Sequence, residues 1–246
     1  MRWAAYLFLP VLLALPASVR AAGYPDEYAL RPLQLPTRMV QIKAPVIVNL
    51  SRGSAGRPVW IPFDIRLGVS DDLELRLFHP VHGVCVRGCD HVYNDLGLGM
   101  LYSVMREPGM DLALLGALEV TSFADPALLR LDLGLGWKLV HAPFSIAAWP
   151  YLSLGLNRRD INGDSINVPI ELAFQISYPT ALFIETGFYG DARHFADTWS
   201  SPLGLGINYL VEYGMDLGAE LKLTNPIGNG GSSDGRLLIV YLALRN

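Results

Sequence analysis

The chain has 246 residues, of which 51% are hydrophobic and only 17% are charged, and its mean hydropathy is +0.30. Such a composition is more apolar than that of most soluble domains, yet beyond the N-terminus no stretch approaches the ~20 consecutive apolar residues that a membrane-spanning helix needs. Of the 19 basic residues, Arg2 and Arg20 lie in a predicted signal segment, and the 17 that remain against 23 acidic residues exclude nucleic acid as an expected partner.

The first 21 residues have the sequence layout of a secretory signal peptide. Arg2 supplies the positive start, the segment 3–15 is apolar, and 19–21 places small residues where a signal peptidase cuts. We therefore expect cleavage after Ala21 and export of the mature chain. Residues 22–38 follow with three prolines and are predicted to form an irregular leader.

Apolar and polar residues alternate strictly between Met215 and Thr224. One parity is apolar, and the other contains Asp216, Glu220 and Lys222. A period of two residues indicates a strand whose two faces meet different surroundings. The pattern recurs at 61–69, 73–77, 96–102, 129–137, 168–176, 182–188, 203–209 and 238–244. The chain is therefore predicted to be all-β.

Two architectures show this alternation, namely a secreted soluble β-protein with an apolar inside and a membrane barrel with an apolar outside. The polar parity is crowded with glycine and the chain has only three lysines, whereas a solvated strand face is usually rich in Lys, Glu and Thr. Glycine on the inner wall of a barrel leaves room for larger neighbours. Aromatic residues near the predicted turns fit the interfacial girdles of a membrane barrel: Tyr102, Phe144, Tyr178 and Tyr213. These features favour the membrane barrel.

The spacing of the turns predicts the number of strands. Tight reversals are expected at Asp72, Pro108, Pro143, Pro179 and Gly214, which are separated by 36, 35, 36 and 35 residues. A hairpin of two ~10-residue membrane strands with its connections needs about that length. Five tight turns and six longer loops require twelve strands. A barrel must also close, so the first strand, near 39–49, is predicted to pair with the last, near 236–245.

With these features the chain resembles an outer-membrane β-barrel protein of Gram-negative bacteria, and is porin-like. The resemblance covers 22–246 and rests on the signal segment, the alternating strands and the hairpin period. It implies a periplasmic leader at 22–38, a closed antiparallel transmembrane β-barrel at 39–246, and location in the bacterial outer membrane. It also implies contact with outer-membrane lipid and with the barrel-assembly machinery, and no cofactor. The sequence departs from such barrels at its end, where Tyr241 is the last aromatic residue before Asn246.

Function is expected in the lumen and the loops, because fold alone does not determine it. Strand parity turns ten acidic and six basic residues inward, as a pore lining or an interior polar core: Lys43, Asp64, Arg66, Glu74, Arg76, Asp95, Asp111, Glu119, Arg130, Asp132, Lys138, Glu171, Glu185, Asp216, Glu220 and Lys222. In a water-filled lumen, this acidic excess predicts a passive pore for small hydrophilic solutes with a weak cation preference.

The alternative is a non-conducting structural or adhesion barrel. In that case the inward charges pair, as Arg66 and Glu74 could across the turn at Asp72, and fill the interior, because buried charges need partners. The oligomeric state stays open in either case.

The loops offer three weaker signals. Cys85 and Cys89 are predicted to form a small disulfide in an exported protein, with a free or metal-bound pair as the alternative. Part of a calcium-loop pattern appears at Asp160, Asn162 and Asp164, but Asn162 followed by glycine is equally an ordinary hairpin turn.

An outer-rim hydrolase is the third signal. It could use His194, near Asp191 and Asp197, or His91, which follows Asp90. The sequence contains no Gly-x-Ser-x-Gly nucleophile turn, metal-binding His pair or phosphate-binding glycine loop. The chain is therefore not expected to be an enzyme.

Overall fold

The computed structural model describes residues 24–80, 82–89, 91–123, 126–229 and 232–246. The predicted signal peptide, 1–21, lies outside these residues. In the described part, fifteen strands form one antiparallel sheet. The strands are β1 (Val40–Asn49), β2 (Val59–Ile61), β3 (Asp64–Ser70), β4 (Leu73–Phe78), β5 (Val84–Arg87), β6 (Leu96–Glu107), β7 (Met110–Ser122), β8 (Leu128–His141), β9 (Phe144–Ala148), β10 (Tyr151–Gly155), β11 (Ser165–Ser177), β12 (Thr180–Asp191), β13 (Ser200–Glu212), β14 (Met215–Gly228) and β15 (Ser232–Arg245).

The fifteen strands run from one end of the barrel to the other twelve times, and we call each of these twelve passes a stave. Three staves consist of two consecutive strands each, β2 with β3, β4 with β5, and β9 with β10, and the other nine are single strands. The prediction of a continuous strand at 61–69 is wrong at the start of that range. The stave is interrupted between β2 and β3 at Pro62, which has no N–H to donate to a neighbouring strand.

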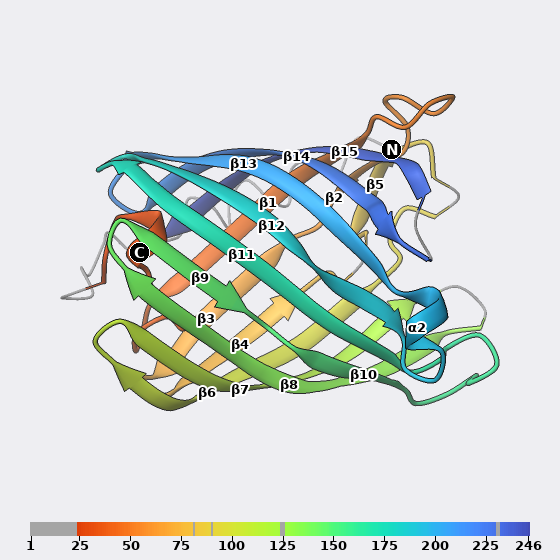
Figure 1. Cartoon of the computed structure of the whole chain (residues 1–246), viewed down its shortest axis with the longest axis horizontal. Helices are drawn as coiled ribbons and strands as arrows, with labels where there is room; N and C mark the ends of the chain where they lie inside the picture. Colours follow the sequence, from red (N-terminus) through yellow and green to blue (C-terminus); the bar gives the residue numbers. More distant parts are fainter. Residues whose placement is uncertain (1–23, 81, 90, 124–125, 230–231) are drawn as a thin grey trace.

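The sheet closes on itself. β1 pairs with β15 from Gln41 opposite Arg245 to Asn49 opposite Leu237, so the predicted pairing of the first and last strands is confirmed. Figure 1 shows the tilted strands wrapping around the interior. Closure pairs the first stave with the last, as a strand structure in a bilayer requires.

The apolar parity faces outward. On β14, Leu217 and Leu221 are 48% and 60% exposed, whereas the residues that precede them, Asp216 and Glu220, are 1% and 6% exposed. The same arrangement holds on the other staves, whose exposed large side chains are mainly Leu, Ile, Val, Phe and Tyr. The outside is therefore suited to lipid and the inside is polar, as the alternation predicts.

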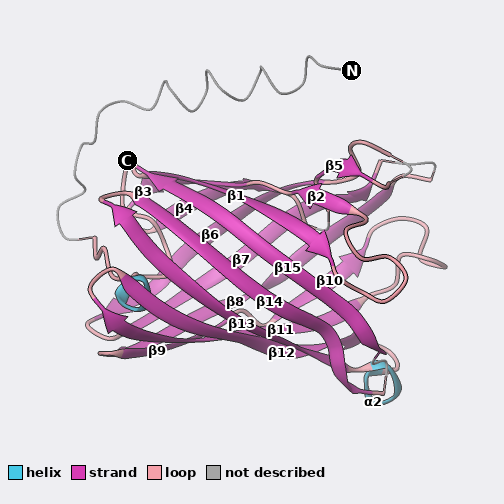
Figure 2. Ribbon diagram, turned by 90° about the horizontal axis from the view of Figure 1, so that it is seen from above, coloured by secondary structure: helices cyan, strands magenta, loops and turns pink. Residues whose placement is uncertain are grey.

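All five predicted tight turns are present at one end of the barrel, which we call the turn end. Two of them use a glycine in the left-handed region, Gly109 with φ 87° and Gly214 with φ 77°. Longer connections occupy the other, loop end. Figure 2 shows the short 3₁₀ helix η2 (Tyr28–Leu30) at the turn end and the helix α2 (Phe195–Thr198) at the loop end. In the described part of the chain, no helix is long and apolar enough to cross a membrane.

Inner-wall glycines make room for large neighbours, as their abundance suggests. A Cβ on Gly218 would lie 2.1 Å from the Tyr241 ring, and one on Gly206 would lie 2.1 Å from the Phe183 ring. Phe183 and Tyr241 belong to a small buried cluster inside the barrel, which also contains Ala29 of the leader. The interior is thus packed by side chains at its turn end instead of being open.

Candidate transport lumen

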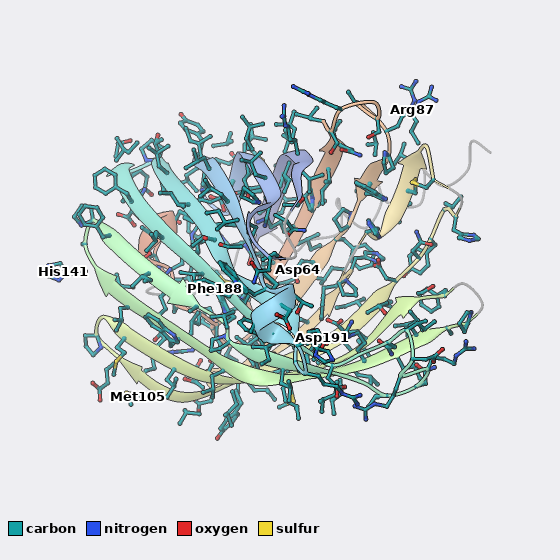
Figure 3. All side chains as sticks on the ribbon, turned by 45° about the vertical axis from the view of Figure 1, so that its right-hand side comes forward. Asp64, Arg87, Met105, His141, Phe188 and Asp191 are labelled. Atoms are coloured by element: carbon teal, nitrogen blue, oxygen red, sulfur yellow. A yellow bond between two sulfur atoms is a disulfide. The ribbon has the colours of Figure 1, made fainter. Side chains whose placement is uncertain are left out.

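A cavity of about 500 Å³ lies inside the barrel. Six acidic and six basic side chains line it: Asp64, Glu119, Asp132, Glu171, Glu185 and Asp216, with Arg31, Lys43, Arg66, Arg76, Lys138 and Lys222. Eleven of these twelve belong to the sixteen inward residues predicted by strand parity, and Arg31 comes from the leader. In Figure 3, Asp64 lies within the barrel, whereas Arg87 lies at the rim.

The other five predicted inward residues do not line the cavity. Arg130 donates to the hydroxyls of Ser153 and Ser165, at 2.8 and 3.0 Å. Glu220 lies 3.9 Å from the ammonium of Lys222. The remaining three are Glu74, Asp95 and Asp111, whose contacts are described below.

Residues 24–38 cross the lumen at the turn end, and we call them the leader strap. The sequence predicts an irregular leader here, and the structure places it inside the barrel. Ala29 and Leu35 are both fully buried. The hydroxyl of Tyr28 donates to Oε2 of Glu171 on β11 at 2.8 Å. Burial, and then the negative charge of Glu171, raises the pKa of Tyr28 well above its usual value, so this phenol remains a donor.

The centre of the strap is fixed by an ion cluster that joins both ends of the chain. Both terminal nitrogens of Arg31 donate to the carboxylate of Asp216 on β14, at 2.9 Å each. Arg245 on β15 donates to the same carboxylate at 2.6 Å. All three side chains are at most 9% exposed. Burial lowers the pKa of Arg31, but the contact with Asp216 outweighs burial and leaves that pKa raised.

The far end of the strap is bound by the opposite part of the wall. The backbone N–H of Leu33 donates to Asp111 on β7 at 3.0 Å, and its carbonyl accepts from Arg66 on β3 at 2.6 Å. The N–H of Leu35 donates to Glu74 on β4 at 2.8 Å. The strap therefore spans the lumen from wall to wall. In the sequence, Leu33 and Leu35 are the signal that the leader is buried, since apolar side chains do not stabilise a leader that stays in water.

Ion pairs neutralise charge along the walls. The predicted pair between Arg66 and Glu74 is confirmed, with Nε of Arg66 2.7 Å from Oε1 of Glu74. Glu74 is fully buried, so this pairing removes the cost of an isolated buried charge. Two further pairs face the cavity, Arg76 with Asp64 at 2.8 Å and Lys222 with Glu185 at 2.7 Å.

A buried cluster at the loop end was not predicted. Nδ1 of His79 lies 2.9 Å from Oδ1 of Asp95, and the N–H groups of His82 and Gly83 donate to the same carboxylate. Burial raises the pKa of Asp95, but these hydrogen bonds outweigh it and hold that pKa below its ordinary value. Strand parity alone could not find this cluster, because His79 and His82 lie in an irregular segment between β4 and β5.

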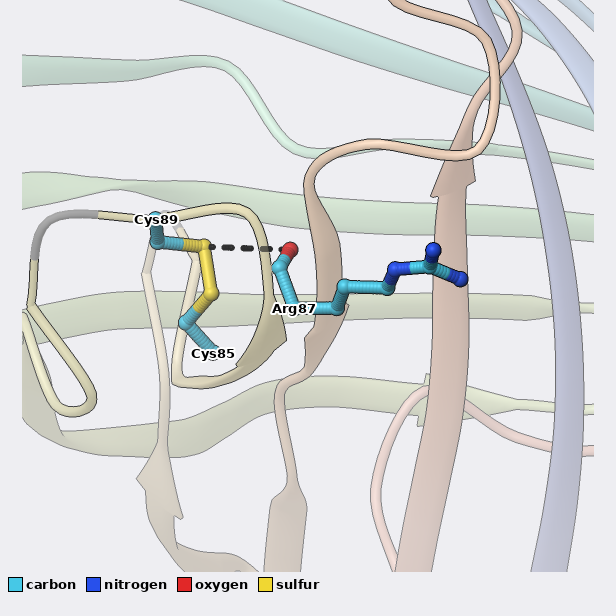
Figure 4. The surroundings of a disulfide bond; sticks show 3 residues. All are labelled: Cys85, Arg87 and Cys89. Carbon is cyan, nitrogen blue, oxygen red and sulfur yellow. Dashed lines mark hydrogen bonds between the residues drawn. A yellow bond between two sulfur atoms is a disulfide. The ribbon is translucent and has the colours of Figure 1, made fainter.

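The predicted disulfide between Cys85 and Cys89 is present at the loop end (Figure 4). Sγ of Cys89 also lies 3.7 Å from the carbonyl oxygen of Arg87, a contact and not a hydrogen bond because a disulfide sulfur carries no proton. The bridge joins Cys85 of β5 to Cys89, just beyond the end of that strand.

The weak calcium candidates make other contacts within the protein. The side-chain amide of Asn162 donates to the carbonyl of Leu129 at 2.7 Å, which is a structural role. Asp164 accepts from the backbone N–H of Gly155, and Asp160 points to solvent with its side chain 65% exposed. Across the described ranges, no group of three or more His, Cys, Asp or Glu could hold a metal ion.

The residues considered for an outer-rim hydrolase make local contacts in a turn or lie in a short helix. Asp191 accepts from the backbone N–H of Arg193 at 2.8 Å and of His194 at 3.0 Å, just before α2. Asp197 lies within that short helix. Asp90, the partner considered for His91, lies outside the described residues.

Solved structures that align with most of this chain include porins and channels, although no family model and no curated protein matches the sequence. The NanC porin, in a rhombohedral crystal form, aligns with a TM-score of 0.63 and 8% identity over 83% of this chain and 98% of its own. The KdgM porin aligns with a TM-score of 0.60 and 9% identity over the same shares. An outer membrane channel from Pseudomonas putida F1 aligns with a TM-score of 0.58 and 11% identity over 93% of this chain and all of its own. The chain therefore has the closed, twelve-stranded, antiparallel barrel fold of outer-membrane porins and channels.

Proposed function

We propose that the protein is a passive outer-membrane channel for small hydrophilic solutes. The observation that carries this proposal is the charged cavity inside a closed barrel whose outside is apolar. A lumen that served only to pack the barrel would not need twelve ionisable side chains around a space of about 500 Å³. That space suits a small solute, since pockets for drug-sized ligands begin at roughly 300 Å³.

The rest of the assignment follows from the fold. Residues 1–21 would direct export, 22–38 would form the periplasmic leader, and 39–246 would cross the outer membrane in contact with its lipid. The barrel-assembly machinery would insert the chain. A KdgM porin has been solved in complex with disordered oligogalacturonate, which supports a hydrophilic solute for barrels of this fold.

We expect a smaller cation preference than the parity count predicts. Ten acidic and six basic inward residues leave an excess of four carboxylates. Four of the five residues that lie off the cavity are acidic, and the strap adds the cation Arg31. The cavity lining is therefore balanced at six against six.

The leader strap supports the second reading, a non-conducting structural or adhesion barrel. It crosses the lumen and is bound on both sides, so it narrows the path at the turn end. Channel function requires solutes and ions to pass beside the strap or to displace it.

Single-channel recording of the refolded protein in a planar bilayer separates the two readings. A channel gives discrete conductance steps, and a salt gradient gives its ion preference. A folded, heat-modifiable protein that stays silent, both as the full chain and after Arg31→Ala loosens the strap, would establish the non-conducting barrel. Replacing His194 should leave conductance unchanged in either case.

A further inference from the structure

Two carboxylates of the cavity lining, Glu119 and Asp132, form no ion pair among the described residues. These two residues are 8% and 5% exposed, and Oδ1 of Asp132 is buried without a hydrogen-bond partner. A buried charge without a partner is costly, so this part of the lumen lacks a cation. The other four carboxylates of the lining are each held by an ion pair or a hydrogen bond: Asp64, Glu171, Glu185 and Asp216.

The two carboxylates are neighbours on the wall. Asp132 of β8 pairs with Ala117 of β7, and Glu119 lies two residues further along β7. The two acids are therefore diagonal cross-strand neighbours, whose side chains can meet. Carboxylates this close repel each other unless a proton or another cation lies between them.

The nearby arginines are engaged elsewhere. Arg130 pairs with Glu119 across the strands, but its guanidinium donates to two serine hydroxyls, as described above, and to the carbonyl of Gly163. It offsets part of the negative charge without forming an ion pair with either acid. Arg76, on β4, is paired with Asp64.

An aromatic ring lies on one side of the acid pair. Phe78 of β4 pairs with Gly97 of β6, and Gly97 pairs with Glu119 of β7. A Cβ on Gly97 would lie 2.7 Å from Cζ of Phe78, and one on Gly99 would lie 3.2 Å from Cε1. The ring therefore covers β6 and reaches toward the two acids. Phe78 also lines the cavity.

A second ring lies on the other side. Tyr151 of β10 pairs with Gly134 of β8, two residues beyond Asp132. A Cβ on Gly134 would lie 2.5 Å from the Cβ of Tyr151, so only glycine lets the tyrosine pack this closely against β8. Tyr151 lines the same cavity. Across five neighbouring staves, the acid pair thus lies between two aromatic side chains.

This combination suits an organic ammonium cation, because carboxylates neutralise its charge and aromatic rings attract it through cation–π contacts. It suits a bare metal ion less well. Calcium takes roughly six to eight oxygen ligands, and in the described part of the chain no group of three or more His, Cys, Asp or Glu could hold a metal. We propose that Glu119 and Asp132, flanked by Phe78 and Tyr151, bind a small organic ammonium cation in the lumen. A role of this site in transport rests on the proposed channel function.

Isothermal titration calorimetry on the refolded full-length protein tests the site without requiring conduction. The probes are choline and neohexanol, its uncharged analogue in which carbon replaces nitrogen, each with a detergent-only blank. Choline should bind, and neohexanol should bind about tenfold more weakly or not at all. Absence of choline binding, or equal binding of the two probes, would overturn the inference even in a conducting channel. Choline binding to a barrel that stays silent in a bilayer would support the site and overturn only the channel function.

Two variants test the residues. Glu119→Gln with Asp132→Asn should weaken choline binding about tenfold or more, because the charge that holds the cation is gone. Tyr151→Leu leaves both carboxylates in place and should weaken binding about tenfold through loss of the ring. Heat-modifiability on a gel shows whether each variant is folded. If the double variant does not fold, Tyr151→Leu and the two probes on the wild-type protein decide the inference.

The matched control is Glu171→Gln with Glu185→Gln. These residues are also cross-strand neighbours that face the cavity, so the control removes the same charge from the same lumen. Glutamine at either position can still accept from Tyr28 or Lys222, the present partners. Choline affinity should stay within about twofold of the wild-type value. An equal loss of affinity in the control and in the acid-pair variant would show a general effect of lumen charge and refute the site.

Discussion

The C-terminal end of the leader strap packs against Gly68, and the substitution Gly68→Ala should displace this end of the strap. A Cβ at this position on β3 would lie 1.9 Å from the carbonyl oxygen of Pro36 and 2.8 Å from that of Leu35, whereas an ordinary contact begins near 3.4 Å. The Gly68 backbone also bonds the end of the strap and the residue that follows it: its carbonyl accepts from the N–H of Arg38 at 2.7 Å, and its N–H donates to the carbonyl of Met39 at 2.9 Å. The strap must therefore move by about 1.5 Å to admit a single methyl group.

The cost follows from those contacts. Weakening two backbone hydrogen bonds costs about 1 kcal/mol each, and overpacking adds roughly 1–3 kcal/mol. A total of about 3 kcal/mol, at the low end, would raise the population of the displaced strap about 100-fold, since each 1.4 kcal/mol is tenfold.

Thiol labelling measures this population. Leu35 is fully buried, so Leu35→Cys should react slowly with a maleimide in the otherwise wild-type protein and about 100-fold faster with Gly68→Ala. Conductance should rise in parallel. Gly116→Ala is the control, because the nearest atom to its new Cβ is 3.7 Å away. Equal labelling with and without Gly68→Ala would refute the close packing of the strap against β3.

Three further perturbations have definite expected outcomes. Arg31→Ala should increase single-channel conductance while heat-modifiability persists, because Arg245 still neutralises Asp216. Glu74→Gln should lower the free energy of unfolding, measured with urea, by about 3–5 kcal/mol, because Arg66 loses its buried partner. The lowered pKa of Asp95 means that its contacts stabilise the fold in full above the ordinary carboxyl pKa of about 4 and lose that contribution as the pH falls through the folded-state value. Asp95→Asn should therefore lower stability at pH 7 and flatten the loss of stability between pH 5 and pH 2.

Strand periodicity predicts the barrel well because each face of a membrane strand meets a different solvent, and the resulting alternation is local in the sequence. The turns at Pro108 and Gly214, the closure of β1 on β15 and the outward leucines are all confirmed. Parity also predicts which residues point inward. It does not predict which of them reach the cavity, because that depends on neighbours from distant strands, as with Glu74 behind Arg66.

Periodicity does not predict the strap or the His79–Asp95 cluster, for a related reason. Neither lies in a regular strand, so no alternation marks it. Tyr28 and Glu171 are separated by 143 residues, and Arg31 and Asp216 by 185. Contacts of this range are set by barrel closure, which no local pattern encodes. The apolar residues Leu33 and Leu35 were the available hint that the leader is buried.

The ion cluster of Arg31, Asp216 and Arg245 also constrains the order of assembly. Arg31 precedes β1, whereas its partner lies on β14 and the second arginine on β15. The docking site for the centre of the strap therefore does not exist until the last two strands have been made and brought beside the first. A barrel that stalls before closure would leave its N-terminal segment undocked and open to proteases, so strap docking marks the completion of folding.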